Sequence, residues 1–350
     1  SGGRGVRTKV PWVVFVLPVA VIAALIPSAF YADERFKVYV HAVQYEGNLF
    51  EIVRKVVGDI GAFLELGNFR PLARIVDRFE HSVAFEISIA TAIPPHIAHG
   101  LFRVIGVVCL SVAAWWLVRL LERSPGDTDS AGPATLLIPI TLAGSLLGLT
   151  TQCPVVLFPF LYLISSSIVI AVSALMIRRR NQGDEPMAWQ AYAGYGALGL
   201  GLAAFNEIAY LAIPISLVVV LAWWWIHQPE VGLRRLRALR AWAVTAAGFL
   251  VLFVPIRLMI AANCSDGACY TASDLRFSGG AIRLWFDRVV DSFFLLGWGR
   301  TRKVIWGEPF VPDPDILWTN WAMIGFVAVL VVGAVAVSRA LAGLPATSGW

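Results

Sequence analysis

The chain contains few charged residues for its size. Charged residues make up 15% of its 350 residues and hydrophobic residues 58%, and the mean hydropathy is +0.72. Water-soluble domains usually carry about 25% charged and about 45–50% apolar residues. This scarcity of charge argues against an ordinary globular domain and predicts a membrane protein.

The sequence also lacks the common nucleotide, metal and haem motifs. It has no P-loop, no Gly-x-Gly-x-x-Gly after a predicted strand, and no Cys/His spacing that matches a zinc or haem site. These absences give no support to an NTPase, a dinucleotide-binding protein or a metal-dependent fold. The formal charge of +5 comes mostly from basic residues beside apolar segments, so we expect no nucleic-acid partner.

Long apolar segments, in contrast, recur along the whole chain. A transmembrane helix needs about 20 mostly apolar residues to cross a hydrocarbon core of about 30 Å. The sequence therefore predicts an all-α polytopic membrane protein with about eight transmembrane helices, forming one membrane domain over residues 1–350. The predicted spans are 12–30, 101–121, 134–151, 155–177, 189–205, 208–226, 241–262 and 317–338.

Clusters of basic residues lie at one end of the predicted spans. They lie before the first span, in the connections after the second, fourth and sixth, and after the eighth, whereas the connections at 151–154 and 206–207 contain none. The positive-inside rule assigns the basic end to the cytoplasm. Both termini are therefore expected in the cytoplasm, with two large segments, 31–100 and 263–316, on the outer face.

Only four cysteines are present, and two of them lie close together in the second outer segment. Cys264 and Cys269 flank an Asp-Gly turn, and a disulfide is favoured there because the outer compartment is oxidising. A metal site is disfavoured because no further His or Cys lies nearby to complete a tetrahedral set. Cys109, inside a predicted span, is most simply a packing residue.

The first outer segment carries two helical patterns. Apolar residues recur at three- and four-residue steps between Glu46 and Leu66, and again between Leu72 and Val83. We expect two amphipathic juxtamembrane helices that lie in the bilayer interface, or alternatively cap the helix bundle. The polar face of the second carries Arg74, Asp77, Arg78, Glu80 and His81. His41, His81, His96 and His99 match no ligand spacing and are interpreted as ordinary interfacial residues.

Three short sequences suggest a family. Asp33-Glu34 directly follows the first span, Gly67–Leu72 reads Gly-Asn-Phe-Arg-Pro-Leu, and Asn206-Glu207-x-x-Tyr210 forms a tight outer connection. Together with the topology they resemble the GT-C class of membrane glycosyltransferases, in which an acidic residue of the first outer loop acts in catalysis. The resemblance implies a bacterial plasma-membrane enzyme that moves a sugar from a polyprenyl-phosphate donor to an envelope glycan, lipid or protein acceptor. The acidic pair of this chain, Asp33-Glu34, differs from the Asp-Asp pair that bacterial members of the class commonly have.

The resemblance also implies roles for individual residues. Asp33 would be the base that deprotonates the acceptor hydroxyl, and Glu34 would assist it or help hold a divalent cation, Mg²⁺ or Mn²⁺. Arg70, with Arg74 or Arg78, would clamp the lipid phosphate, because a guanidinium binds phosphate through two hydrogen bonds. The alternative for the acidic pair is a solvated helix exit, and for Arg70 a contact with lipid headgroups.

Glu207 lies in a connection of only two residues, 206–207, between two predicted spans. This connection is too short to extend the side chain far into water. An acidic group near membrane depth is by default functional or paired. We therefore expect Asn206, Glu207 and Tyr210 at a polar substrate site, with a structural ion pair to Arg257 or Arg103 as the alternative for Glu207. Two other functions remain open: a transporter or flippase of lipid-linked sugars, and a non-catalytic membrane subunit of an envelope assembly. No internal repeat supports the transporter.

Overall fold

The chain is built from helices. In the computed structural model the described residues are 13–23, 26, 32–122, 138–139, 142, 159–181, 188–226 and 234–264, and over these ranges no strand is present. The helices are α1 (Val13–Ala23), α2 (Ala32–Tyr45), α3 (Leu49–Gly58), α4 (Ile60–Glu65), α5 (Pro71–Thr91), α6 (Pro95–Glu122), α9 (Pro159–Asn181), α10 (Trp189–Phe205), α11 (Glu207–Tyr210), α12 (Ala212–Ile226) and α13 (Arg234–Asn263).

Three of these helices are long and apolar enough to cross a membrane. They contain the segments Pro95–Leu121, Phe160–Arg178 and Ala238–Asn263, and two shorter apolar stretches, Val14–Ala23 and Glu207–Ala222, accompany them. The predicted helical class is thus confirmed for the described residues, and three of their helices could cross a membrane by length and composition. The number of spans stays a prediction, because 317–338 and nearly all of 134–151 lie outside the described residues.

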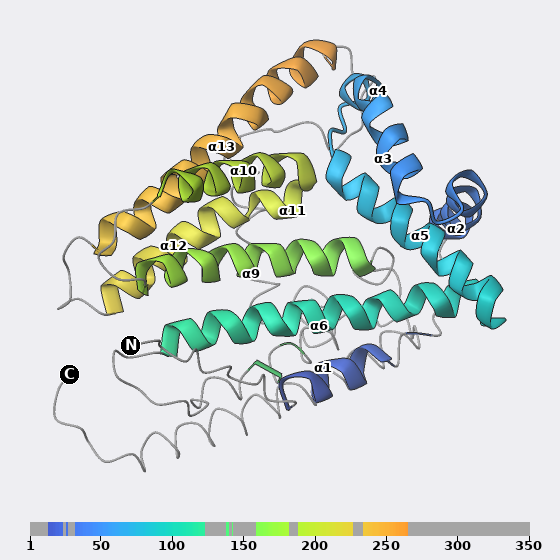
Figure 1. The fold of residues 1–350 in the computed structure, drawn as a ribbon, viewed down its shortest axis with the longest axis horizontal. Coiled ribbons are helices and arrows are strands. Elements are labelled where there is room, and N and C mark those ends of the chain that lie inside the picture. Colours follow the sequence, from blue (N-terminus) through green and yellow to red (C-terminus); the bar gives the residue numbers. More distant parts are fainter. Residues whose placement is uncertain are drawn as a thin grey trace, which may run out of the picture.

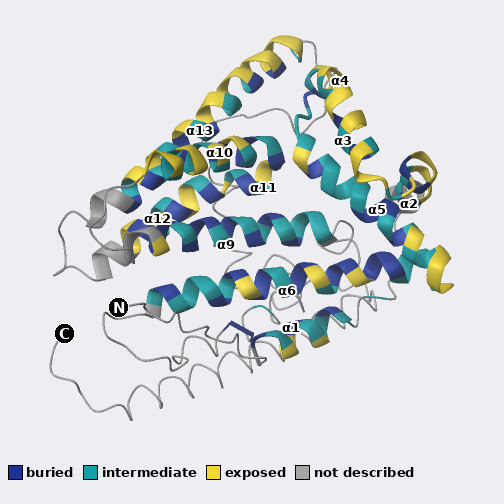
Figure 2. Ribbon diagram, in the orientation of Figure 1, coloured by how far each residue is buried: buried dark blue, intermediate teal, exposed yellow. Residues whose placement is uncertain are grey.

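The apolar helices lie side by side in a bundle (Figure 1). α6 packs along α9 and α1, α10 packs along α13, and α12 contacts α9 and α13. Large apolar side chains remain exposed on the side of α13 that faces away from the other helices, among them Val251 at 69% and Leu258 at 66% (Figure 2). Exposed side chains of this kind fit a surface that faces lipid.

Glycines bring α10 and α13 into close contact. A methyl group on Gly199 would collide with the carbonyl oxygen of Thr245, and one on Gly248 would collide with the carbonyl oxygen of Gly196. Small residues allow transmembrane helices to approach in this way. Gly199 and the backbone of Gly196 make this contact, whereas a methyl group on Gly194 or Gly201 would meet open space.

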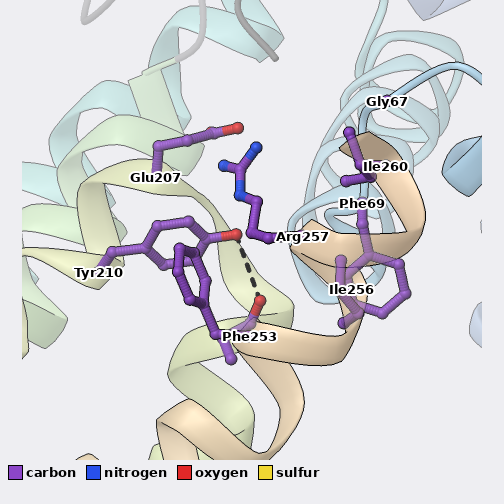
Figure 3. Close-up of a pocket in the computed structure, with 9 residues that line it drawn as sticks. Gly67, Phe69, Glu207, Tyr210, Phe253, Ile256, Arg257 and Ile260 are labelled. Atoms are coloured by element: carbon purple, nitrogen blue, oxygen red, sulfur yellow. Dashed lines mark hydrogen bonds between the residues drawn. The ribbon is translucent and has the colours of Figure 1, made fainter. Parts of the chain in front are cut away.

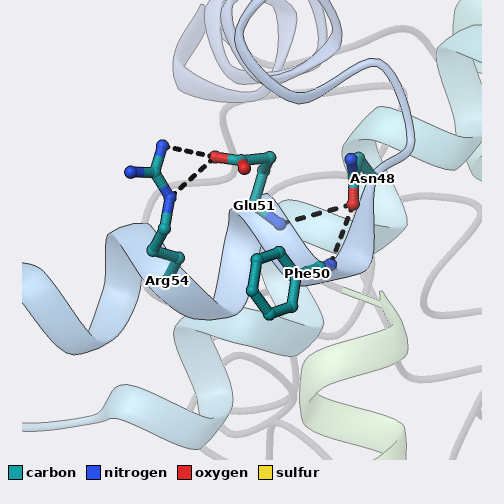
Figure 4. Close-up of polar contacts among 4 residues, drawn as sticks. All are labelled: Asn48, Phe50, Glu51 and Arg54. Atoms are coloured by element: carbon teal, nitrogen blue, oxygen red, sulfur yellow. Dashed lines mark hydrogen bonds and ion pairs between the residues drawn. The ribbon is translucent and has the colours of Figure 1, made fainter.

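Helices α2 to α5 form a separate layer at one end of the bundle (Figure 1). α5 packs against α2, α3 and α6. The helix predicted between Glu46 and Leu66 is in fact two helices that meet at Asp59, and α2 was not predicted. α3 begins at Asn48, whose side-chain oxygen accepts hydrogen bonds from the backbone N–H groups of Phe50 (3.0 Å) and Glu51 (3.4 Å), a helix N-cap (Figure 4).

α3 has two different apolar surfaces. Ile52 and Val56 are fully buried, in a cluster that includes Phe63 and draws in Phe79 of α5. Phe50 is 73% exposed. The buried stripe packs within the α2–α5 layer, against Phe63 and Phe79. Whether this layer lies in the bilayer interface stays a prediction.

Candidate functional site

A glycine turn positions Arg70. α4 ends at Leu66, and Gly67 follows with φ = 70°, a conformation that glycine adopts without strain. The N–H of Gly67 donates to Leu64 O (3.1 Å) and that of Asn68 to Phe63 O (2.8 Å), which is the hydrogen-bond pair of a Schellman motif. The chain then turns through Phe69 and Arg70 into α5, which begins at Pro71.

A capped helix break positions Glu207. Asn206 has extended backbone angles between α10 and α11, and its side-chain oxygen accepts from the N–H of Ala209 at 2.9 Å. Its amide group donates to Ser165 Oγ at 2.7 Å. Asn206 is buried, and each end of its side chain makes one of these bonds. It therefore fixes the first turn of α11 and the place of Glu207, and its role in substrate binding stays a prediction.

These two turns meet the outer end of α13 at a small recess (Figure 3). Its cavity volume is about 10 Å³, which is room for about one water molecule, and it opens to solvent. The walls come from the Gly67–Phe69 turn, from Ala203 and α11, and from one side of α13; the residues are Gly67, Phe69, Ala203, Glu207, Tyr210, Phe253, Ile256, Arg257 and Ile260. The recess thus combines an apolar wall with charged groups at its rim.

An ion pair joins the two turns. Arg70 Nε lies 3.0 Å from Glu207 Oε1, and the two side chains are 22% and 43% exposed. The guanidinium of Arg257 reaches from α13 toward the Glu207 carboxylate, with the Tyr210 hydroxyl on its other side (Figure 3). The Tyr210 hydroxyl donates to Ala203 O at 3.3 Å. Arg70 is thus a partner of Glu207 that the sequence did not suggest, and the alternative of a pair with Arg257 or Arg103 stays a prediction.

The three predicted clamp arginines follow one another along α5 but have different surroundings. Arg70 is not a lining residue of the recess but contacts its rim through the ion pair with Glu207. The Arg74 guanidinium stacks on the ring of Phe63 at 4.5 Å, and burial, with the neighbouring charge of Arg78, lowers the pKa of Arg74. Arg78 Nη2 lies 3.5 Å from Asp59 Oδ2. Arg74 and Arg78 therefore line the contact between α5 and α3–α4.

The acidic pair lies in α2. Asp33 and Glu34 form part of its first turn, although their side chains lie outside the described residues, so their relation to the recess stays a prediction. α2 is tied to α5 one helical turn further on, where Lys37 Nζ lies 3.8 Å from Asp77 Oδ2.

A second polar cluster lies between α5 and α6, and sequence reasoning missed it. Glu80, His81, His99 and Arg103 are between 0% and 1% exposed. His99 Nε2 lies 3.1 Å from Glu80 Oε1, and the rings of His81 and His99 stack with 5.0 Å between their centroids. The interpretation of these two histidines as ordinary interfacial residues is therefore wrong. The polar face of α5 is covered by α2 and α6 instead of facing solvent.

Burial changes the proton affinities in this cluster. It raises the pKa of Glu80 to about 8, because the carboxylate loses its hydration. It lowers the pKa of His81, and burial together with the neighbouring His81 lowers the pKa of His41 to about 4. The cluster therefore favours a neutral Glu80 carboxyl group and neutral histidines at neutral pH.

Within the described ranges, no group of three or more His, Cys, Asp or Glu side chains could hold a metal ion. Glu207 is the one carboxylate in the wall of the recess. The expected divalent cation is thus left to Asp33 and Glu34 and stays a prediction.

Cys264 is disulfide-bonded. Residues 265 onward lie outside the described part of the chain, so the pairing with Cys269 stays a prediction. Cys109 is a free cysteine within α6, as expected for a packing residue.

Comparison of the chain with protein families, with curated proteins and with solved structures finds no match.

Proposed function

We propose that the protein is a GT-C-like membrane glycosyltransferase that moves a sugar from a polyprenyl-phosphate donor to an acceptor in the cell envelope. The observation that carries this proposal is the recess where Arg70, Glu207, Tyr210 and Arg257 meet. Its cationic rim and apolar wall suit an amphiphilic anion, which is the chemistry of a lipid phosphate.

The reaction would proceed as an inverting displacement. Asp33 accepts the proton of the acceptor hydroxyl while the hydroxyl oxygen forms a bond to the anomeric carbon. The bond between that carbon and the phosphate oxygen breaks, and polyprenyl phosphate leaves with the electron pair. A phosphate leaving group needs no strong general acid, only positive charge, which Arg70 and Arg257 would supply.

Sugar transfer by purified protein in lipid tests the proposal. Radiolabelled polyprenyl-phosphate sugars are offered with envelope glycan, lipid and protein acceptors to the wild type and to Asp33→Asn. We expect transfer by the wild type and a loss of about 100-fold or more in a folded Asp33→Asn protein, the contribution typical of a general base. Transfer unaffected by the substitution would move the role of base to Glu34. Chelation followed by addition of Mg²⁺ or Mn²⁺ tests the metal requirement in the same assay.

The buried cluster favours one rival function, a transporter or flippase of lipid-linked sugars. His99 and Arg103 are buried within the apolar segment Pro95–Leu121, and ionisable side chains in such segments often mark transport or proton pathways. A flippase would move a labelled lipid-linked sugar between the leaflets of a vesicle without forming a glycosidic bond, whereas the proposed enzyme would form that bond. Absence of transfer together with flipping would establish the transporter.

A further inference from the structure

Glu207 occupies the position that the recess offers to an anion. We propose that its carboxylate is a stand-in for the ligand phosphate: it holds Arg70 in the ligand-free protein and is displaced when a phosphomonoester of an apolar chain binds between Arg70 and Arg257. This inference rests on the proposed function, since the donor lipid is the expected ligand. It adds a role for Arg257 and an exchange of anions at one site.

The geometry supports an exchange, because Glu207 is the movable partner. Its side chain is 43% exposed and that of Arg70 is 22% exposed, so the carboxylate can swing into solvent more easily than the guanidinium. Arg70 is fixed at the start of α5, just before Pro71. A ligand anion entering from the mouth would find the guanidinium already in place.

The remaining walls suit the rest of such a ligand. Phe69, Phe253, Ile256 and Ile260 provide apolar surface within the same recess. The Arg257 guanidinium lies over the ring of Phe253 at 5.4 Å, which restrains it at the rim. Two guanidinium groups can each donate two hydrogen bonds to one phosphate, whereas the single carboxylate has fewer acceptor positions and less charge. Phosphate is thus the stronger partner for this pair of arginines.

The exchange predicts that removing the charge of Glu207 strengthens ligand binding. A carboxylate that contributes to ligand binding would weaken binding when neutralised. Glu207, in contrast, competes with the ligand and repels it, so Glu207→Gln should strengthen binding. A partly exposed ion pair is worth up to about 1 kcal/mol, which corresponds to about fivefold in affinity.

Binding of radiolabelled farnesyl phosphate to the full-length protein in phosphatidylcholine nanodiscs tests the inference. The variants are Glu207→Gln, Glu207→Asp and Arg257→Gln. Glu51→Gln is the matched control, because Glu51 also pairs with an arginine, Arg54 at 2.6 Å, but on the exposed side of α3 away from the recess (Figure 4). Farnesol, inorganic phosphate and phosphatidic acid are the competing ligands. Thermal unfolding confirms that each variant is folded.

We expect about fivefold tighter binding by Glu207→Gln, no gain by Glu207→Asp or Glu51→Gln, and about tenfold weaker binding by Arg257→Gln. Farnesol and inorganic phosphate alone should compete poorly. Unchanged or weaker binding by Glu207→Gln would overturn the exchange while leaving the proposed function intact. No binding by any variant would overturn both. Equal competition by phosphatidic acid would keep the exchange but assign the site to ordinary lipid headgroups, against the donor lipid.

Discussion

At the scale of single residues, the buried carboxyl of Glu80 is the most unusual group of the described chain. It is 1% exposed, 3.1 Å from His99, and its pKa is raised to about 8. In the unfolded chain the same group ionises near its ordinary pKa, about 4.3. The folded state therefore binds a proton that the unfolded state has released at neutral pH, and that difference makes stability depend on pH.

This linkage predicts how Glu80→Gln behaves. Stability from the protonated carboxyl is fully present below the unfolded pKa and is lost as pH rises toward about 8. The lowered pKa values of His41 and His81 have the opposite effect. They reduce the stability of the folded protein as pH falls below about 6.5, because only the unfolded chain then binds these protons. Because the other groups are the same in both proteins, between pH 7 and 8 the wild type should lose up to about 1.4 kcal/mol of stability per pH unit relative to Glu80→Gln.

Thermal unfolding in detergent at pH 6, 7 and 8 measures this difference. Glu46→Gln is the control, since Glu46 is exposed. Parallel pH curves for the wild type and Glu80→Gln would show that Glu80 is already ionised in the folded protein.

At the scale of elements, the turn between α4 and α5 determines where Arg70 lies. Gly67→Ala would force an alanine into φ = 70° and is expected to cost about 1 kcal/mol of stability. Gly61→Ala, in α4 with open space around its Cβ position, is the matched control and should be neutral or slightly stabilising. Because the turn also carries Phe69, the Gly67 variant should lose farnesyl phosphate affinity and the Gly61 variant should not. Equal affinities would mean that the turn does not shape the recess.

Much of the outer layer could be predicted from the sequence, and the failures have physical causes. Pro71 and the apolar stripe after it predicted the start of α5 correctly. The burial of its polar face could not be predicted, because Glu80 and His81 are as compatible with water as with a partner helix. Only the position of α6, which brings His99 to Glu80, decides between these environments. α2 was missed because its charged residues conceal any simple apolar stripe.

The recess, too, could be predicted from the sequence only in part. Glu207 and Arg70 were each predicted as binding residues, from the short connection and from the Gly-Asn-Phe-Arg-Pro-Leu sequence. Their ion pair could not be predicted, since it depends on how the outer layer sits on α11 and α13. Arg257 had been considered only as a structural partner, because a lone arginine at the end of a span gives no signal of a ligand.

At the scale of the whole molecule, α6 and α9 run in one direction along the bundle, and α10 and α13 run in the other (Figure 1). The end that carries Arg119, Arg178 and Arg240 is therefore predicted to face the cytoplasm, opposite the α2–α5 layer. In a variant in which both Cys109 and Cys153 are replaced by serine, Glu51→Cys should react with a membrane-impermeant maleimide in intact cells. Arg178→Cys should react only after the membrane is opened. The reverse pattern would invert the proposed orientation.

The ion pair between Arg70 and Glu207 also bears on how the protein is made. Its two residues lie far apart in the sequence, and the recess also requires α13, which is synthesised later still. The outer layer can therefore leave the ribosome and fold early, while the anion site forms only when α10 to α13 have been inserted beside α9. The parts of the recess therefore come together only after α13 has been synthesised.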